Sequence, residues 1–280
     1  FERLTLEVDY YNQRTKDMIF DVPLSYTTGF GSILKNVGEM ENKGIEFLIN
    51  ANVLRNKDFS WDVRFTGTAN KNKIIKLATE KPIENTLTIR KVGEAYNTFY
   101  MPEYAGVDPE TGEAMWYKGQ EGDEKTKNVN EAGQRIVGSA DPKFYGGFST
   151  DFSYKGVTLN AVFNYSCGGK KLSPYYESLI TSRGTGIASI DLVDRWTPEN
   201  TDAKFPRPIY NDPTDTETMY YNTFSASQMD FSVQNASFLR LSTLSLSYTF
   251  PKSVSEKMRI GNLRIYSTVS NAVSYTHLRA

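Results

Sequence analysis

The residue types that most often carry out catalysis are scarce in this sequence. It contains one cysteine, Cys167, and one histidine, His277. Nucleophilic and general acid–base catalysis usually needs such a side chain, or two carboxylates held face to face. Cys167 precedes two glycines at the end of a strand-like segment, where we expect it to take no part in chemistry. The sequence therefore predicts no catalytic residues, and we expect a protein that is not an enzyme.

Three carboxylates lie on the polar phase of alternating segments: Glu46, Asp62 and Asp151. A carboxylate at such a position most simply faces water on the polar side of a sheet. A single cysteine also excludes an internal disulfide framework and a cysteine-rich metal site. We therefore expect neither a metal nor a cofactor.

Aromatic residues in one long segment are the best candidates for ligand binding. Segment 167–236 combines tyrosines with Asp, Asn and Thr. Flat rings can stack on the apolar faces of sugars while neighbouring oxygens accept hydrogen bonds from hydroxyls. The alternative is that these rings pack the segment against itself or lie at a membrane interface, where Tyr is enriched. The candidate ligand-binding residues are Tyr175, Tyr176, Tyr210, Tyr220 and Tyr221.

Composition excludes several classes of protein. The 280 residues include 32 Lys and Arg against 33 Asp and Glu, a net charge of −1 that argues against nucleic-acid binding. No run approaches the roughly 18 apolar residues of a membrane-spanning helix. A membrane β-barrel remains compatible with the mean hydropathy of −0.49, because its strands alternate apolar and polar residues. Tyr, Phe and Trp make up 13% of the chain, which favours strands.

Strict alternation of apolar and polar residues recurs along the chain and predicts β-strands. The segments run to about ten residues, the length that a tilted strand needs to cross a bilayer, whereas strands of soluble sandwiches are shorter. With two weaker strands near 96–104 and 113–118, we expect about nine strands. The strongly alternating segments are 4–11, 45–52, 61–70, 148–155, 157–166, 243–250 and 263–269.

The connections between these segments alternate between short and long. Three are short, and four excursions are longer than compact soluble domains usually contain. Every long excursion falls on the same side if the strands run up and down, as in outer-membrane barrels with short periplasmic turns and long extracellular loops. The short links are 53–58, 155–156 and 251–262, and the long excursions are 13–42, 71–95, 119–143 and 167–236.

Five motifs then resemble one family, the SusC/RagA-type TonB-dependent outer-membrane transporters of Bacteroides-like bacteria. They occur in the family's order and span most of the chain. One departure is 118–125, where the family often has a calcium-loop-like stretch but this chain has too few spaced carboxylates for a metal. The motifs are 36–46 (NVGEMENKGIE), 104–112 (YAGVDPETG), 138–147 (GSADPKFYGG), 195–200 (RWTPEN) and 236–251 (ASFLRLSTLSLSYTFP).

The resemblance implies a partial barrel, about nine strands of a 22-stranded transmembrane barrel with a plugged lumen. Residues 1–272 would be the C-terminal part of the barrel, without the plug domain and the last strand. The implied function is TonB-dependent import of an oligomeric nutrient, with a SusD-like surface lipoprotein closing the barrel mouth and TonB acting through the missing N-terminal region. The implied cargo is a glycan, or else a peptide, and Trp196 looks structural because it lies in a shared family motif.

Two alternatives concern the class of protein and its ends. A soluble or surface-anchored all-β glycan-binding module would also show alternating strands, provided that the apolar faces meet across a protein core. Residues 273–280 (VSYTHLRA) resemble the translation of a transposase adapter, so we expect a non-native tail; a natural strand end with a basic tail is the alternative. If this tail is foreign, His277 is foreign as well.

Overall fold

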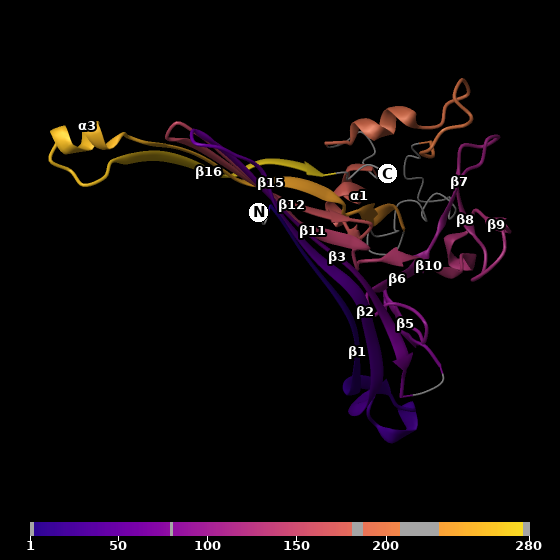
Figure 1. The fold of residues 1–280 in the computed structure, drawn as a ribbon. Helices are drawn as coiled ribbons and strands as arrows, with labels where there is room; N and C mark the ends of the chain where they lie inside the picture. Colours follow the sequence, from indigo (N-terminus) through magenta and orange to yellow (C-terminus); the bar gives the residue numbers. More distant parts are fainter. Residues whose placement is uncertain (1–2, 79–80, 181–186, 208–229, 277–280) are drawn as a thin grey trace.

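A computed structural model describes residues 3–78, 81–180, 187–207 and 230–276. Its main feature is one antiparallel seven-stranded sheet (Figure 1). The strands of this sheet lie side by side in the order in which they occur along the chain. The sheet twists from an arm that ends in helix α3 to the hairpin of its first two strands. The strands are β1 (Leu4–Pro23), β2 (Ser32–Arg55), β3 (Phe59–Lys76), β11 (Phe144–Tyr154), β12 (Val157–Cys167), β15 (Phe238–Thr249) and β16 (Arg264–Thr276).

The register aligns the apolar phases of all seven strands in continuous rows. Each row lies on one face, because successive side chains of a strand point to opposite sides. At the two ends of the middle row Leu6 is 61% exposed and Val273 59%, and the five side chains between them are half-buried, so the row lacks the burial that the core of a soluble sandwich requires. The middle row is Leu6, Ile49, Phe65, Phe148, Phe163, Leu241 and Val273.

The expected count of nine sheet strands is wrong for the described residues, because the sheet holds seven. The weaker strands near 96–104 and 113–118 do form, but they pair within small sheets outside the large one. Excursions 71–95 and 119–143 consequently merge into a single connection between β3 and β11. The two long connections that remain, 77–143 and 168–237, still leave the sheet at the same end, because an even number of strands separates them.

The expected long loop at 13–42 is also wrong. β1 and β2 continue to pair through this region, and only residues 24–31 separate them. Alternation fails there because the register shifts between Thr15 and Met18, where Asp17 takes a positive φ of 55°. Such a bulge reverses which side chains face each side, which hides the strand from a period-two pattern.

The links at the opposite end are short, as predicted. Residues 56–58 join β2 to β3, Lys155 and Gly156 join β11 to β12, and residues 250–263 join β15 to β16 through helix α3 (Lys252–Lys257). Val273 pairs with Leu241 and continues β16 into the segment expected to be a foreign tail. The origin of that segment stays a prediction, and His277 lies outside the described residues.

Small elements fill the two longest connections. One hydrophobic cluster joins Phe20 and Ile74 of the sheet to Leu77 and Ile83 of the connection, and a second surrounds the buried Trp116. The strands are β4 (Ile83–Glu84), β5 (Ile89–Arg90), β6 (Thr98–Pro102), β7 (Tyr104–Val107), β8 (Ala114–Tyr117), β9 (Lys125–Thr126), β10 (Gln134–Ser139), β13 (Lys170–Leu172) and β14 (Val233–Asn235). The helices there are α1 (Pro174–Ile180) and the 3-10 turns η2 (Val129–Glu131), η3 (Ile190–Asp194) and η5 (Asp230–Ser232), and one further 3-10 turn, η1 (Tyr26–Thr28), lies between β1 and β2.

Within the described ranges, every helix is too short or too polar to cross a membrane.

Candidate functional site

The polar face of the seven-stranded sheet is lined by hydroxyl, amide and charged side chains that bind one another across strands. Asn160 donates to Asp151 over 2.7 Å, and Arg64 donates to Asn50 over 2.8 Å. Ser245 and Thr268 form a further hydroxyl pair at 3.0 Å. This face can therefore offer many exchangeable hydrogen bonds to a polar molecule that passes over it.

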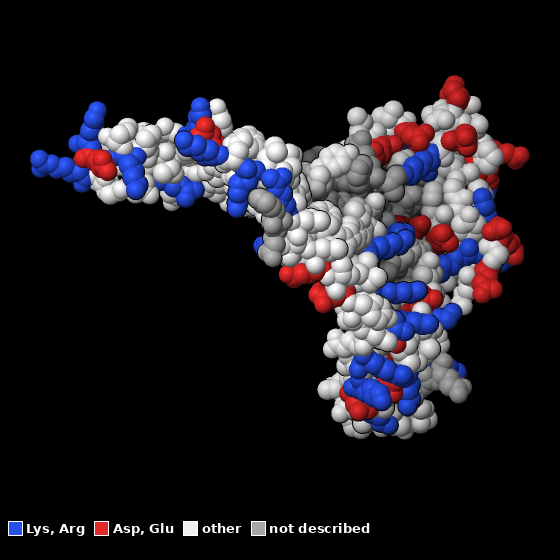
Figure 2. Space-filling model, viewed as in Figure 1, with Lys and Arg blue, Asp and Glu red and all other residues white. Residues whose placement is uncertain are grey.

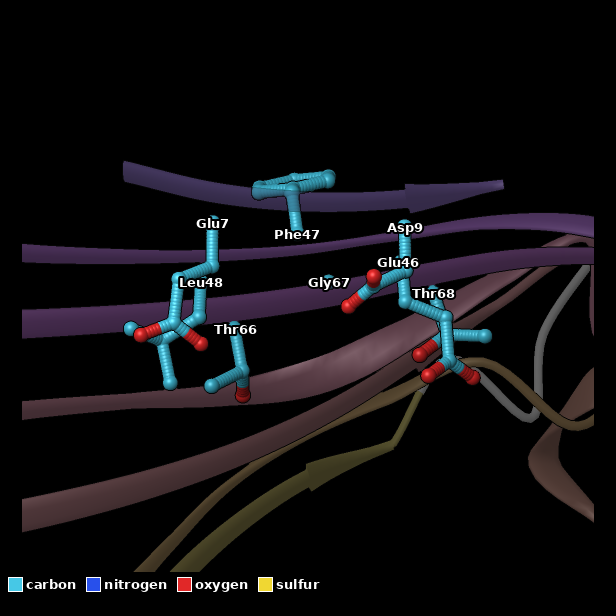
Figure 3. Close-up of a pocket in the computed structure, with 8 residues that line it drawn as sticks. All are labelled: Glu7, Asp9, Glu46, Phe47, Leu48, Thr66, Gly67 and Thr68. Carbon is cyan, nitrogen blue, oxygen red and sulfur yellow. The ribbon is translucent and has the colours of Figure 1, made fainter. Parts of the chain in front are cut away.

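A hollow of about 250 Å³ on this face collects three carboxylates, those of Glu7, Asp9 and Glu46 (Figure 3). Asp9 lies directly opposite Glu46 in the β1–β2 register. Thr66 and Thr68 of β3 complete the polar lining, and Figure 3 shows Phe47 pointing to the other side of the sheet. Like charges at paired positions repel each other, so this hollow favours cationic groups over anionic ones.

The sequence placed Glu46 on the polar face correctly but did not indicate the convergence. Bringing Glu7 and Asp9 to Glu46 depends on the β1–β2 register. Across the described part of the chain, no group of three or more His, Cys, Asp or Glu residues has the arrangement to hold a metal ion.

Asp62 and Asp151, the other predicted polar-face carboxylates, occupy paired positions on β3 and β11. Asp62 lies 3.7 Å from the guanidinium of Arg55, and Asp151 accepts the hydrogen bond from Asn160. Each carboxylate therefore has its own partner within the sheet. Asp62 and Asp151 are therefore part of the polar lining, as their place in the alternating segments predicts.

Above the sheet, two of the sequence motifs pack into one unit. The indole N–H of Trp196, in 195–200, donates to the backbone oxygen of Pro109, in 104–112, over 3.1 Å. The backbone N–H of Arg207 donates to the oxygen of Gly112 over 2.8 Å. This geometry agrees with the structural role expected for Trp196.

An ion-pair cluster holds the same turn. Lys127 lies 2.6 Å from Asp108 and 2.7 Å from Glu113. Its hydrogen bond to Asp108, together with backbone N–H donors from Glu110 and Thr111, lowers the pKa of that carboxyl to about 2. Burial alone would raise the pKa of Glu113, but hydrogen bonds from Lys127 and Thr111 outweigh burial and lower it.

The structure describes two of the five predicted ligand-binding tyrosines. Tyr175, on α1, is 71% exposed. Tyr176 is half-buried, and its hydroxyl donates to Asp191 over 3.0 Å. Tyr210, Tyr220 and Tyr221 lie outside the described residues. Cys167 is exposed at the end of β12.

Two curated relatives match nearly the whole chain. TonB-dependent receptor P3 of Formosa agariphila is 32% identical over 295 residues, which cover 98% of this chain and 28% of that protein. TonB-dependent receptor SusC of Bacteroides thetaiotaomicron is 27% identical over 293 residues, which cover 96% of this chain and 26% of that protein. The chain thus spans about 30% or less of the length of these relatives. No protein-family model matches the chain.

Solved structures give the same result. The RagAB peptide transporter aligns with a TM-score of 0.77 at 31% identity, over 98% of this chain and 30% of that chain. The open-open state of the RagAB peptide importer aligns with a TM-score of 0.79 at 33% identity, over 98% and 29% respectively. The seven-stranded sheet therefore corresponds to part of a receptor barrel. The chain belongs to the SusC/RagA-type TonB-dependent receptors, an outer-membrane transport family rather than a family of enzymes.

Proposed function

We propose that the chain forms barrel wall and extracellular loops of an importer that moves an oligomeric nutrient across the outer membrane. Import is coupled to TonB and works together with a SusD-like surface lipoprotein. One observation carries this proposal: the sheet has an unbroken apolar row across seven strands on one face, with no protein layer from the described part of the chain burying it, and a polar lining on the other. Such a wall fits between lipid and a wet lumen.

The polar face would give the cargo a path along which it makes no single strong hydrogen bond to the wall. Cross-strand pairs such as Asn160 with Asp151 already satisfy their own hydrogen bonds, so a cargo exchanges partners instead of binding tightly. The carboxylates of Glu7, Asp9 and Glu46 make the start of the sheet unfavourable for anionic cargo. We therefore propose a neutral or cationic cargo.

We propose an oligosaccharide as the cargo class. Tyr175 supports this, because its ring is exposed on the loop side and can stack on the face of a sugar. Tyr210, Tyr220 and Tyr221 remain proposed members of the same surface. Tyr176 is a weaker member, because its hydroxyl is engaged by Asp191. The solved relative is a peptide transporter, which makes peptides the competing class in the test.

The test is uptake in a strain that lacks the complete gene product containing this chain. Fluorescent neutral oligosaccharides and peptides of matched size are supplied to the deletion strain, the complemented strain and a strain without functional TonB. We expect oligosaccharide uptake only where the receptor and TonB are both present. Uptake of peptides alone would overturn the cargo class, and uptake that does not depend on the receptor would overturn the transport function.

A pair of variants tests the loop surface. Tyr175→Ala removes the exposed ring and should lower oligosaccharide uptake. Tyr176→Phe keeps the ring and loses only the hydrogen bond to Asp191, so it serves as the matched control. Equal uptake by the Tyr175→Ala variant and the unaltered protein would remove Tyr175 from the cargo surface.

A further inference from the structure

The link between β15 and β16 carries exposed apolar side chains at the far end of the sheet. Val254 is 38% exposed, Met258 55% and Ile260 40%. Val254 and Met258 are four residues apart across the short helix α3, where the N–H of Met258 bonds to the oxygen of Val254, so they lie on one face. Glu256 is two residues from each and therefore projects to the opposite side. The link is thus amphipathic, with its acidic residue turned away from the apolar pair.

Three cations lie on the same link as these apolar side chains, namely Lys252, Lys257 and Arg259. The three short links together carry five Lys and Arg against the two acids Asp58 and Glu256. The two longest connections, 77–143 and 168–237, show the opposite balance, with 14 Lys and Arg against 21 Asp and Glu. Figure 2 shows blue side chains gathered over the arm that ends in α3. The cations of the short links are Lys57, Lys155, Lys252, Lys257 and Arg259.

The link is also continuous with the lipid-facing side of the sheet. Ile265, which follows it, is 61% exposed, and Tyr248, which precedes it, packs edge-on against Phe250 with ring centroids 4.8 Å apart. At the same end, Phe59 packs edge-on against Phe152 at 4.7 Å. Aromatic residues of this kind mark the level at which a membrane strand leaves the hydrocarbon.

We propose that the β15–β16 link is a lipid-headgroup anchor. Val254, Met258 and Ile260 enter the boundary between headgroups and acyl chains of the leaflet on the short-link side, while Lys252, Lys257 and Arg259 bind lipid phosphates. Apolar side chains beside long cationic ones are the pattern that holds a helix in a membrane interface. The surplus of cations at this end gives the charge complementarity, and the continuous apolar face fixes the depth. The inference rests on the proposed function only in requiring that the sheet spans a membrane.

The test places a fluorescent probe on the link in the complete gene product. In a Cys167→Ser background, Met258→Cys is labelled with an environment-sensitive dye and reconstituted in vesicles of equimolar phosphatidylethanolamine and phosphatidylglycerol. We expect emission at shorter wavelength than in water and strong quenching by lipids spin-labelled near the headgroup. Replacing Lys252, Lys257 and Arg259 with Glu should abolish most of this quenching, and neutral phosphatidylcholine vesicles should weaken it.

Dye labels at two further positions distinguish a link that does not bind lipid from a sheet that does not span a membrane. The same dye at Leu6→Cys, in the middle apolar row, should be quenched by lipids spin-labelled deep in the acyl chains. A dye at Gln120→Cys, in the long connection, should be quenched by aqueous iodide. If Leu6→Cys reports lipid but Met258→Cys is quenched only by iodide, or only becomes protected when a partner protein is added, the anchor is overturned and the barrel stands. If Leu6→Cys also reports water, both are overturned.

Discussion

The ring of Trp196 lies against the α-carbon of Gly112, so close that a Cβ atom on Gly112 would come within 2.5 Å of two carbons of the indole. Gly112 also has a positive φ of 74°, which favours glycine. The turn at 104–112 and the loop at 195–207 are therefore one packed unit, although more than 80 residues separate them. This contact therefore joins the connection between β12 and β15 to the connection between β3 and β11, at the loop side of the sheet.

The Trp196 contact predicts that Gly112→Ala will loosen both loops. The methyl group meets the indole and the positive φ adds strain, so we expect a local loss of about 2 kcal/mol. Hydrogen exchange of residues 194–207 measures this directly. Gly119→Ala is the control, because Gly119 has a φ of 73° and its nearest neighbour to an added Cβ is 4.0 Å away. Equal exchange in the two variants would mean that backbone strain acts alone.

The Lys127 cluster predicts a loss of loop order on acidification. The pKa of Asp108 is about 2 in the folded loop and lies below its ordinary value of 3.8, so its stabilisation is complete above that value and is lost as pH falls toward 2. Because Lys127 is partly exposed, we expect the effect to be about 1 kcal/mol. Hydrogen exchange of residues 108–113 between pH 5 and pH 2, corrected for intrinsic rates, measures it.

Lys127→Met should reduce that pH dependence, leaving the part due to the backbone N–H groups of Glu110 and Thr111, and should loosen the turn at neutral pH. Lys118→Met is the matched control, because Lys118 is as exposed as Lys127 and also faces two carboxylates, Glu124 at 3.3 Å and Glu131 at 3.8 Å, but these carboxylates are exposed whereas Asp108 and Glu113 are largely covered. We expect little change from the control, as for most surface pairs. A control as damaging as Lys127→Met would contradict a special role for the Asp108 and Glu113 contacts.

Asp230 predicts a pH response of opposite sign. Burial raises its pKa to about 6, although the N–H of Tyr104 donates to it over 3.0 Å. Since the folded pKa lies above the ordinary 3.8, the contribution of this group is complete below pH 4 and is lost as pH rises toward 6. The Tyr104 amide should therefore exchange faster at pH 7 than at pH 5 after correction for intrinsic rates. Asp230→Asn, which keeps an acceptor oxygen but does not titrate, should remove the difference.

Much of the large sheet could be predicted from sequence because a period of two reports directly which side chains share a face. The same pattern does not show which other strand a given strand pairs with. Near 96–104, adjacent residues Tyr100 and Met101 are both buried, at 4% and 0% exposure, because β6 lies within the folded connection and pairs with β10. The site shows the same limit: Glu46 was placed on its face by alternation, but its approach to Asp9 follows from register.

The apolar face makes the most direct prediction about the membrane. Leu6 lies in the middle row and is 61% exposed, so Leu6→Arg would place a guanidinium in the centre of the hydrocarbon layer. Arg at the midplane of a barrel's lipid face costs about 2–4 kcal/mol. Thr5→Arg is the matched control, since Thr5 is the neighbouring residue of β1 and points to the polar face, opposite Asn50. We expect Leu6→Arg in the complete gene product to reduce the folded fraction, measured by its migration on unheated detergent gels, while Thr5→Arg folds normally. If the two variants fold equally well, the apolar row does not face lipid, because an aqueous surface tolerates arginine at both positions.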